Sequence, residues 1–331
     1  MKAITVQGDA GIEGLVYGEV PTPVPGEGEV RVKLLASGIN HIDVYQCTPA
    51  MVQHEKPHTM GADGAGIVDK AGSGATLKPG DEVILDPNLG DPTQPGYGLV
   101  GAQCAGTHAE FIVLPEKNFF PKPDNLSFEE AAALPLALTT AYRQLISRAR
   151  LTKGENVLIH GVGGGVMLYC LQLAAQAGAF SIVTSSSDEK LETAKSLGAD
   201  VCINYKTGDV AGAVMEATDG RGADVVVDNV GAPTFAVSAK CVALNGRITI
   251  VGGAAHHVIP EVNLRDLYFK QVDIHTSTMA TPEEFKQAMA LAAEGKIKAH
   301  IDSTYPLSRF REAIKRVAGG RQFGKVVITR D

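Results

Sequence analysis

Hydrophobic and polar positions follow two different patterns along the chain, and the change falls near residue 125. Before this point, short apolar runs of β character alternate with Pro/Gly turns such as segments 23–26 and 78–81. This pattern predicts a compact β domain. Its predicted strands are residues 3–6, 30–36, 66–71, 82–85 and 109–114.

After residue 125, segments of helical and strand periodicity alternate. The predicted helices are 128–148, 166–177, 188–197, 209–218 and 234–243, and the predicted strands are 157–160, 181–184, 201–204, 224–228, 246–251 and 272–275. Such alternation is typical of an α/β fold with a parallel sheet covered on both faces. The last segment, with helices 282–294 and 307–318 and strand 325–329, is expected to return to the β domain. We therefore expect the active cleft between two domains.

The order strand, glycine-rich turn, amphipathic helix and strand appears in residues 154–185. Glycines at 161, 163, 164 and 165 allow backbone N–H groups to approach a pyrophosphate at the helix N-terminus. The third glycine of the dinucleotide-binding pattern is missing, because Val166 or Met167 stands there. The segment predicts a nucleotide-binding βαβ unit, with Met167 as its main irregularity.

The end of the second strand of this unit bears on the choice of cofactor. Thr184 is followed by Ser185, Ser186 and Ser187, with no carboxylate at the position that binds the ribose hydroxyls in NAD-binding folds. Hydroxyl groups and Lys190 can bind a 2′-phosphate, and Tyr205 is placed to flank the adenosine. This favours NADPH (NADP+) over NADH. Two alternatives stay open: the serines cap the helix that begins at Asp188, and Asp188 itself reaches the ribose.

Composition narrows the class of protein further. The 331 residues are 44% hydrophobic and 20% charged, which is ordinary for a globular enzyme of two domains. A net charge of −7 and the lack of a basic run argue against binding to nucleic acid. The five cysteines form no CxxC pair and are interpreted as reduced thiols, which indicates a cytoplasmic protein. Neither a signal peptide nor a membrane span is predicted.

Several motifs together make the chain resemble the medium-chain dehydrogenase/reductase superfamily, in its zinc-independent quinone oxidoreductase-like (zeta-crystallin-like) branch. They are PTPVPGEGEVRVKLLASGINHIDVY, GADGAGIV, KPGDEVI, EEAAALPLALTTAYRQL, the βαβ unit, KLETAKSLGAD, GRGADVVVDNVG, STM and FGKVVITR. The resemblance implies a GroES-like domain over 1–139, completed by 280–331, and a doubly wound Rossmann domain over 140–279. It also implies a homodimer that pairs through strand 272–275 (Val272 to His275).

The chain departs from the zinc-dependent members at the metal ligands. Asn40 stands where those enzymes have cysteine, and Ala62 stands where they have histidine. The segment where a four-cysteine structural zinc loop is expected contains only Cys104. We therefore predict no metal, although an improvised site remains open; its candidate ligands are His54, His58, Cys104 and His108.

Without a metal Lewis acid, hydride addition to a quinone or to the activated C=C of an enone is favoured over alcohol oxidation. By resemblance Asn40 lies near the nicotinamide, and Tyr45 is the candidate proton donor, with water as the alternative. The simpler interpretation is that Asn40 orders its own loop and Tyr45 is packing, while Asp43 fixes local backbone. A zinc-free alcohol or ketone dehydrogenase and a non-catalytic nucleotide-binding protein stay as alternative functions.

The resemblance implies further cofactor contacts in both halves of the chain. They are Thr140, Gly163, Gly164, Gly165, Val166, Asn229, Val230, Gly252, Gly253, Thr278 and Lys325, besides Asn40. For Lys325 the alternative is a solvated terminal charge. The substrate pocket is expected to be lined by loops 46–59 and 86–106, neither of which has a legible motif.

Overall fold

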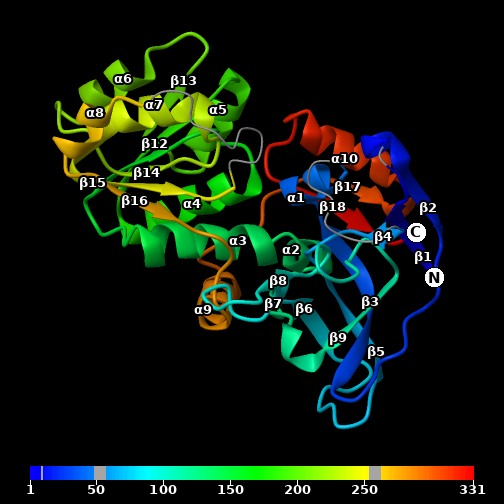
Figure 1. The fold of residues 1–331 in the computed structure, drawn as a ribbon. Coiled ribbons are helices and arrows are strands. Elements are labelled where there is room, and N and C mark those ends of the chain that lie inside the picture. The colour runs from blue at the N-terminus through cyan, green and yellow to red at the C-terminus, as the bar shows by residue number, and fades with distance from the viewer. Residues whose placement is uncertain (9, 48–56, 253–261) are drawn as a thin grey trace. The chain divides into compact units, whose positions relative to one another are not determined.

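The computed structural model describes residues 1–8, 10–47, 57–252 and 262–331. The chain divides into two compact units, and each is built from its own sheets (Figure 1). Unit 1 consists of Met1–Thr139 and Thr281–Asp331, and unit 2 consists of Thr140–Ala280.

Unit 1 is a β domain that is completed by the C-terminal segment. Its larger sheet has the strand order β10-β6-β5-β3-β18-β17, with β9 also paired to β3, and its smaller sheet has the order β2-β1-β4. The strands are β1 (Lys2–Val6), β2 (Leu15–Glu19), β3 (Glu29–Gly38), β4 (His58–Thr59), β5 (Ala65–Ala71), β6 (Glu82–Leu85), β7 (Asn88–Leu89), β8 (Gly98–Leu99), β9 (Phe111–Pro115), β10 (Phe119–Pro121), β17 (Ile301–Pro306) and β18 (Lys325–Thr329).

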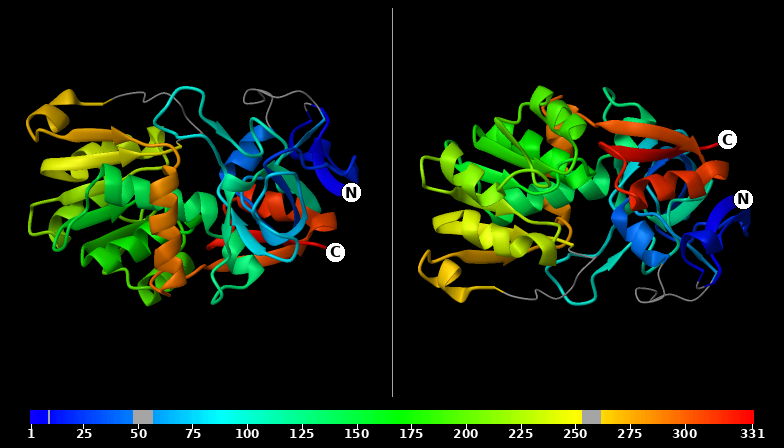
Figure 2. Two further views of the ribbon diagram at one scale, coloured as in Figure 1. Left: turned by 90° about the horizontal axis from the view of Figure 1, so that it is seen from below. Right: turned by 90° about the horizontal axis from the view of Figure 1, so that it is seen from above.

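Four α-helices of the described chain, together with 3-10 turns, accompany these strands. They are α1 (His41–Gln46), α2 (Phe128–Ala132), α9 (Pro282–Ala293) and α10 (Phe310–Ala318), and the turns are η1 (Gly11–Gly14), η3 (Glu116–Asn118) and η5 (Leu307–Arg309). Figure 2 shows α10 beside β17 and β18. The apolar face of α10 packs into a core with residues of β1 and β18, so the returning segment is an integral part of unit 1.

Unit 2 has a six-stranded parallel sheet in the order β13-β12-β11-β14-β15-β16 among its described residues. The strands are β11 (Asn156–Ile159), β12 (Phe180–Ser185), β13 (Val201–Asn204), β14 (Ala223–Val227), β15 (Val242–Ile250) and β16 (Asp273–Thr276). The helices are α4 (Gly165–Ala177), α5 (Asp188–Ser196), α6 (Val210–Ala217), α7 (Ala232–Cys241) and α8 (Leu264–Tyr268). Figure 1 shows helices on both faces of this sheet, and the strand order is that of a doubly wound Rossmann domain.

The predicted continuous helix over 128–148 is wrong in one respect, because the chain forms three helical segments there. These are α2, α3 (Pro135–Tyr142) and a π-helical segment, η4 (Arg143–Arg148). Pro135 has no N–H and fixes its own φ, so it starts a new helix instead of continuing the preceding one. The new start leaves the N–H of Leu136 without a helical partner, and this group becomes part of the site described below.

No helix among the described residues is long and apolar enough to cross a membrane.

Candidate active site and cofactor site

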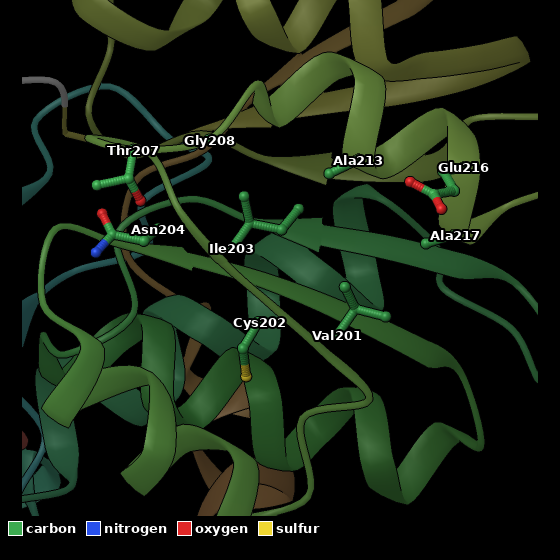
Figure 3. Close-up of a pocket in the computed structure, with 9 residues that line it drawn as sticks. All are labelled: Val201, Cys202, Ile203, Asn204, Thr207, Gly208, Ala213, Glu216 and Ala217. Atoms are coloured by element: carbon green, nitrogen blue, oxygen red, sulfur yellow. The ribbon is translucent and has the colours of Figure 1, made fainter.

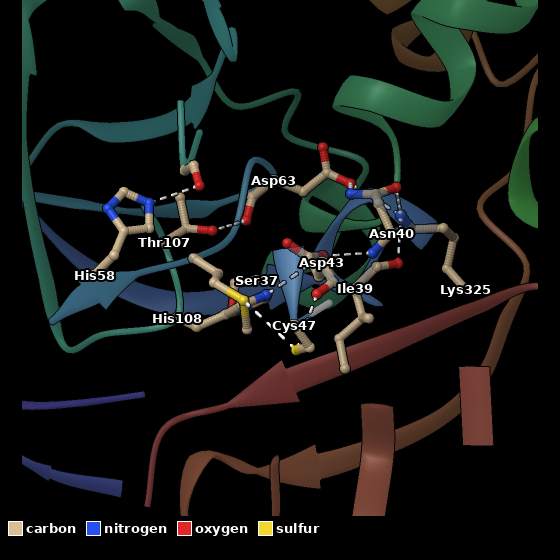
Figure 4. A network of polar contacts seen from close by, with 12 residues as sticks. Ser37, Ile39, Asn40, Asp43, Cys47, His58, Asp63, Thr107, His108 and Lys325 are labelled. Carbon is tan, nitrogen blue, oxygen red and sulfur yellow. Dashed lines mark hydrogen bonds and ion pairs between the residues drawn. The ribbon is translucent and has the colours of Figure 1, made fainter. Parts of the chain in front are cut away.

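Three side chains of unit 1 form a buried polar cluster, shown in Figure 4: Asn40, Asp63 and Lys325. The Lys325 ammonium donates to Oδ1 of Asn40 at 2.6 Å, to Oδ2 of Asp63 at 2.9 Å and to the Ile39 carbonyl at 3.0 Å. Nδ2 of Asn40 donates to the same Oδ2 of Asp63 at 2.9 Å. The side chains of Lys325 and Asp63 are 4% and 0% exposed. The ion pair is therefore buried and hydrogen-bonded on several sides, as a stable buried pair requires.

Strand pairing brings these distant residues together. β18 pairs antiparallel with β3, and the N–H of Ile39 donates to the carbonyl of Val326 at 2.9 Å. The register places Lys325, at the start of β18, next to the residues that follow β3. Gly38, at the end of β3, permits the close approach of the C-terminal end of α2 and of Asp63, because a Cβ there would lie 2.5 Å from the Ala132 carbonyl oxygen and 3.0 Å from Oδ2 of Asp63.

Asp63 is held from two further directions. The N–H of Leu136, at the start of α3, donates to Oδ1 at 2.7 Å, and the Thr107 hydroxyl donates to the backbone carbonyl of Asp63 at 2.7 Å. Each carboxylate oxygen thus accepts at least one hydrogen bond. Asp63 was not among the site residues predicted from sequence, since a single aspartate between Ala62 and Gly64 carries no chemical signature without knowledge of its partners.

A second buried network, formed by Asp43, His108 and Ser37, fixes the backbone of Asn40. Oδ2 of Asp43 accepts from the N–H of Asn40 at 2.7 Å, and Nε2 of His108 lies 3.5 Å from the same oxygen. Ser37 Oγ and His108 Nδ1 are 3.2 Å apart. The Asp43 carboxylate therefore orders local backbone, as predicted from sequence. His108 contacts the same carboxylate, and this contact was not predicted.

Tyr45 lies on α1, one turn from His41, and the two ring centroids are 6.3 Å apart. The phenol is half-buried, and burial raises its pKa above the ordinary value. Tyr45 therefore stays protonated at neutral pH and retains a proton to donate.

The glycine-rich turn of unit 2 lies between a strand, β11, and a helix, α4, as the sequence predicted. Gly161 and Gly163 adopt φ values of +71° and +142°, which favour glycine. The N–H of Gly161 donates to Oγ1 of Thr184 at 3.0 Å, which ties the turn to β12. α4 begins at Gly165 with Gly164 as its N-cap residue, and a Cβ on Gly164 would meet nothing within 4 Å. The helix N-terminus is thus open for an anionic group.

Around this turn, Val166 is half-buried and Met167 is 5% exposed. The bulky side chain that replaces the family's glycine is therefore packed away from solvent. The turn and helix accommodate it while the N-terminus of α4 stays free of side chains at Gly163, Gly164 and Gly165.

The residues predicted to contact the adenosine end lie where β12 and β13 finish. Ser187 Oγ accepts from the N–H of Lys190 and caps α5, so the capping interpretation of the serines is correct for Ser187. Ser185 Oγ accepts from the N–H of Ser187 at 3.3 Å. The N–H of Tyr205 donates to the Ser185 carbonyl, and its side chain is 50% exposed.

Asp188 was left open in the sequence analysis as a residue that binds the ribose hydroxyls of NADH. Its Oδ1 accepts from Nδ2 of Asn204 at 2.7 Å. The side chain is thus engaged with the end of β13. Ser186 is half-buried beside it, on the loop that leads into α5.

The other predicted cofactor residues of unit 2 lie at or near strand ends. Asn229 exchanges hydrogen bonds with Gln144, whose Nε2 also donates to the Thr249 carbonyl. Val230 lies beside Gly161, because its Cγ2 is 3.5 Å from where a Cβ of that glycine would be. Gln144 was missed, since it stands inside a predicted helix where a polar residue gives no signal.

Four further positions complete this set. The Thr140 hydroxyl is buried and donates to Sδ of Met279 at 3.4 Å. Gly252 has φ of +78° and is exposed, and Thr278 is exposed. Gly253 lies outside the described residues.

The donor set does not fit a catalytic zinc ion. Asn40 uses both ends of its amide for Lys325 and Asp63, and Ala62 has no donor atom. His58 Nε2 contacts the Gly101 carbonyl at 2.9 Å, away from the Ser37 and Asp43 partners of His108. Within the described residues, no group of three or more His, Cys, Asp or Glu side chains is arranged to hold a metal ion. His54 lies outside those residues.

Two surface hollows are formed by described residues of unit 2. One, of about 430 Å³, lies between β13 and α6 and is shown in Figure 3; Cys202, Asn204 and Glu216 are among its lining residues. The other, of about 650 Å³, lies along α8 and the start of β16. Neither is lined by a predicted catalytic or cofactor residue, so the turn at Gly161 and the Asn40 cluster remain the candidate sites.

Comparison with known proteins agrees with this architecture. Residues 26–124 match the family described as alcohol dehydrogenase GroES-like domain, and residues 165–294 match the family described as zinc-binding dehydrogenase. A quinone oxidoreductase of Pseudomonas aeruginosa is 35% identical over 339 residues, with 99% of each chain covered. The chain belongs to the medium-chain dehydrogenase/reductase superfamily.

Solved structures extend the comparison to the whole fold. The crystal structure of an NAD-dependent alcohol dehydrogenase has a TM-score of 0.96 and 37% identity, with 100% of both chains covered. A 2-octenoyl-CoA carboxylase reductase in complex with NADP and 2-octenoyl-CoA has a TM-score of 0.89 and 28% identity, covering 99% of this chain and 87% of the other. The protein is an NAD(P)-dependent oxidoreductase with a GroES-like domain and a Rossmann domain.

Proposed function

We propose that the protein is an NADPH-dependent reductase that transfers hydride to a quinone or to the activated C=C of an enone. The observation that carries the proposal is the cluster at Asn40. The position where zinc-dependent relatives have a cysteine holds an amide that is bonded to a buried lysine and a carboxylate. Such a site offers hydrogen-bond donors to an oxygen atom, without a metal to acidify an alcohol.

Bound NADPH supplies the hydride in this reaction. In an enone, the hydride would form a C–H bond at the β carbon, and the C=C electron pair would form a double bond between the α carbon and the carbonyl carbon. The π pair of the carbonyl group would then move to its oxygen, which gives an enolate. Asn40 stabilises that oxygen by donating an N–H of its amide. Tyr45 returns a proton to the α carbon, or to the oxygen when the acceptor is a quinone, and water then reprotonates the phenol.

The turn at Gly161 would hold the cofactor pyrophosphate at the N-terminus of α4. Ser185, Ser186, Lys190 and Tyr205 would bind the 2′-phosphate end. The engagement of Asp188 by Asn204 supports NADPH over NADH, because it restrains the carboxylate that was predicted to compete for the ribose. We propose that the remaining predicted contacts of unit 2 line the same cofactor, and they are Thr140, Asn229, Val230, Gly252, Gly253 and Thr278. Lys325, predicted from the resemblance as a further contact, already donates to three oxygen atoms of unit 1.

Product analysis with deuterated cofactor tests the reaction. The protein is incubated with NADPH labelled at the transferred position and with 1,4-naphthoquinone or 2-cyclohexenone, and excess chelator is added in a parallel sample. We expect oxidation of NADPH in both samples and deuterium at the β carbon of the saturated ketone. Absence of turnover over a broad panel of quinones and enones would refute the proposal.

A zinc-free alcohol or ketone dehydrogenase is the second candidate, and the similarity to an NAD-dependent alcohol dehydrogenase favours it. The same labelled experiment separates the two functions. Reduction of the carbonyl group with the alkene intact identifies the dehydrogenase. Binding of NADPH without turnover of any acceptor identifies the third possibility, a non-catalytic nucleotide-binding protein.

We also propose a homodimer that pairs through β16. In the described sheet this strand pairs only with β15, and its Ile274 is 45% exposed. Leu264, Tyr268 and Phe269 on the neighbouring helix segment are exposed to 59% or more. An open strand edge beside apolar side chains is suited to pairing with another copy. A cytoplasmic location, indicated by five free thiols, is part of the same proposal.

A further inference from the structure

We propose that Lys325 is a positioning residue: it fixes the amide of Asn40 so that one N–H of Nδ2 is presented to the substrate oxygen. The inference rests on the proposed function and adds to it the residue that prepares the donor. It differs from a direct cofactor contact, which is what the resemblance alone implied for Lys325.

The chemistry of the two partners determines which way the amide points. An ammonium group can only donate and an ionised carboxylate can only accept. Lys325 lies 2.6 Å from Oδ1 of Asn40, and Asp63 lies 2.9 Å from Nδ2. Rotation of the amide by half a turn would set NH₂ against the ammonium and the carbonyl oxygen against the carboxylate. Both hydrogen bonds would become repulsive contacts, so one orientation is strongly favoured.

Lys325 itself has no donor to spare. Its three N–H groups are matched by three oxygen acceptors, the Ile39 carbonyl, Asn40 Oδ1 and Asp63 Oδ2. Its side chain is 4% exposed. The lysine therefore acts on a substrate through Asn40. Nδ2 of Asn40, in contrast, uses one N–H for Asp63 and has a second N–H for which no acceptor is recorded among the described residues.

The ammonium also strengthens the donor that it orients. A cation that is hydrogen-bonded to an amide oxygen draws electron density toward that oxygen, and the N–H groups of the same amide become better donors. Asp63 balances the charge of Lys325 within the cluster, so the cluster contributes orientation and polarisation and brings no net charge. Such preorganised dipoles stabilise an oxyanion without reorganising during the reaction.

A double-mutant cycle tests whether Lys325 works through Asn40. The variants are Asn40→Ala, Lys325→Met and the double variant, with kcat, KM and the NADPH dissociation constant measured for each. We expect Lys325→Met to lower kcat by up to roughly a hundred- to a thousandfold, the loss that removal of an oxyanion donor causes, and to leave NADPH affinity unchanged. In the Asn40→Ala background, the same substitution should have no further effect on kcat.

Two outcomes would overturn the inference. One is an equal loss of kcat in both backgrounds. The other is a loss that resides in NADPH affinity, which would make Lys325 a cofactor ligand.

A matched control uses another buried lysine of unit 1. Lys122 is 8% exposed and donates to the carbonyls of Pro123 and Leu126, with Glu82 at 3.2 Å. Lys122→Met removes a similar buried ammonium outside the candidate site. It should affect stability and leave kcat unchanged. If Lys325→Met fails to fold, the charge-balanced variant Lys325→Met/Asp63→Asn replaces it in the cycle.

Neutron diffraction of the wild-type protein tests the orientation without an activity measurement. Deuterium atoms on Nδ2 should face Asp63, with Oδ1 of Asn40 facing the Lys325 ammonium. The opposite orientation would refute the inference even if the wild-type protein reduces quinones. Absence of wild-type turnover with the correct orientation would instead refute the proposed function and leave the geometry of the cluster confirmed.

Discussion

The carboxylate of Asp63 lies 2.9 Å from the ammonium of Lys325, although the two residues are 262 positions apart in the chain. Both are buried within one unit. The pair therefore joins the segment before β5 to the beginning of β18. Its removal should lower the free energy of unfolding of the whole unit. The same carboxylate accepts from Asn40 and Leu136, so one side chain connects four parts of the structure.

Asp63→Asn should destabilise the protein strongly. The substitution leaves the buried Lys325 charge without its counterion, and breaking a buried pair in this way costs about 3–5 kcal/mol. Urea unfolding measures the change. Asp69→Asn is the matched control, since Asp69 pairs with Arg31 on the same sheet but its side chain is 33% exposed. That control should cost about 1 kcal/mol or less, and equal losses in the two variants would contradict the assigned burial effect.

Lys190→Ala should weaken NADPH binding selectively. Loss of a charge-assisted contact to a phosphate costs about 1.5 kcal/mol or more, which is roughly a tenfold rise in dissociation constant. NADH has no 2′-phosphate, so its affinity should stay unchanged. Isothermal titration with both nucleotides checks this, with Lys195→Ala on the same helix as the control. An equal loss of affinity for NADH would show that Lys190 supports the fold of the site and does not bind the 2′-phosphate.

The stability of the protein should carry a pH dependence from Asp86. This side chain is 4% exposed, and burial raises its pKa to about 6, while hydrogen bonds from Asn88 act in the opposite direction. A raised pKa in the folded state means that the folded protein binds the proton more tightly. The resulting stabilisation is fully present below about pH 4 and is lost as the pH rises through about 6.

Asp86→Asn removes this dependence and keeps an oxygen that accepts from Asn88. We expect the variant to gain stability over the wild type as the pH rises from 4 to 7, by about 3 kcal/mol at most. Thermal unfolding at several pH values gives the comparison. Parallel curves for the two proteins would show that the Asp86 carboxyl titrates as it does in the unfolded chain.

Ile274→Glu should convert the proposed dimer into a monomer. A charge on the open edge of β16 blocks strand pairing, a device that natural proteins use to protect such edges. Light scattering after gel filtration measures the mass of each species. Val24→Glu is the control, because Val24 is a 71% exposed apolar residue of unit 1. A dimer that survives Ile274→Glu would place the interface elsewhere.

The sequence predicted the Rossmann domain well because local patterns encode it. Strand 201–204 and the glycine turn at 161–165 are specified by periodicity and by residues that permit unusual φ values. The break at Pro135 was missed, since the helical periodicity of the surrounding segment continues across it. In that case the steric effect of one residue prevailed over the pattern of its neighbours.

The Asn40 cluster is encoded non-locally, and so only part of it was predictable. Asn40 was found through a departure from a familiar motif, but Asp63 has no signature of its own. The available signals were weak: a carboxylate between Ala62 and Gly64, and a lysine before the apolar run 326–328. The role of such charged residues can be inferred only when strand pairing shows which residues they contact.

The antiparallel pairing of β18 with β3 constrains the order of assembly on the ribosome. All of Thr140–Ala280 is synthesised before β18 emerges, so the Rossmann unit can become compact while the first 139 residues still lack a neighbouring strand and a core helix. Contacts over so many intervening residues form slowly. The nascent β domain therefore has an unfilled strand position until β18 is synthesised, and an open strand edge of this kind favours aggregation.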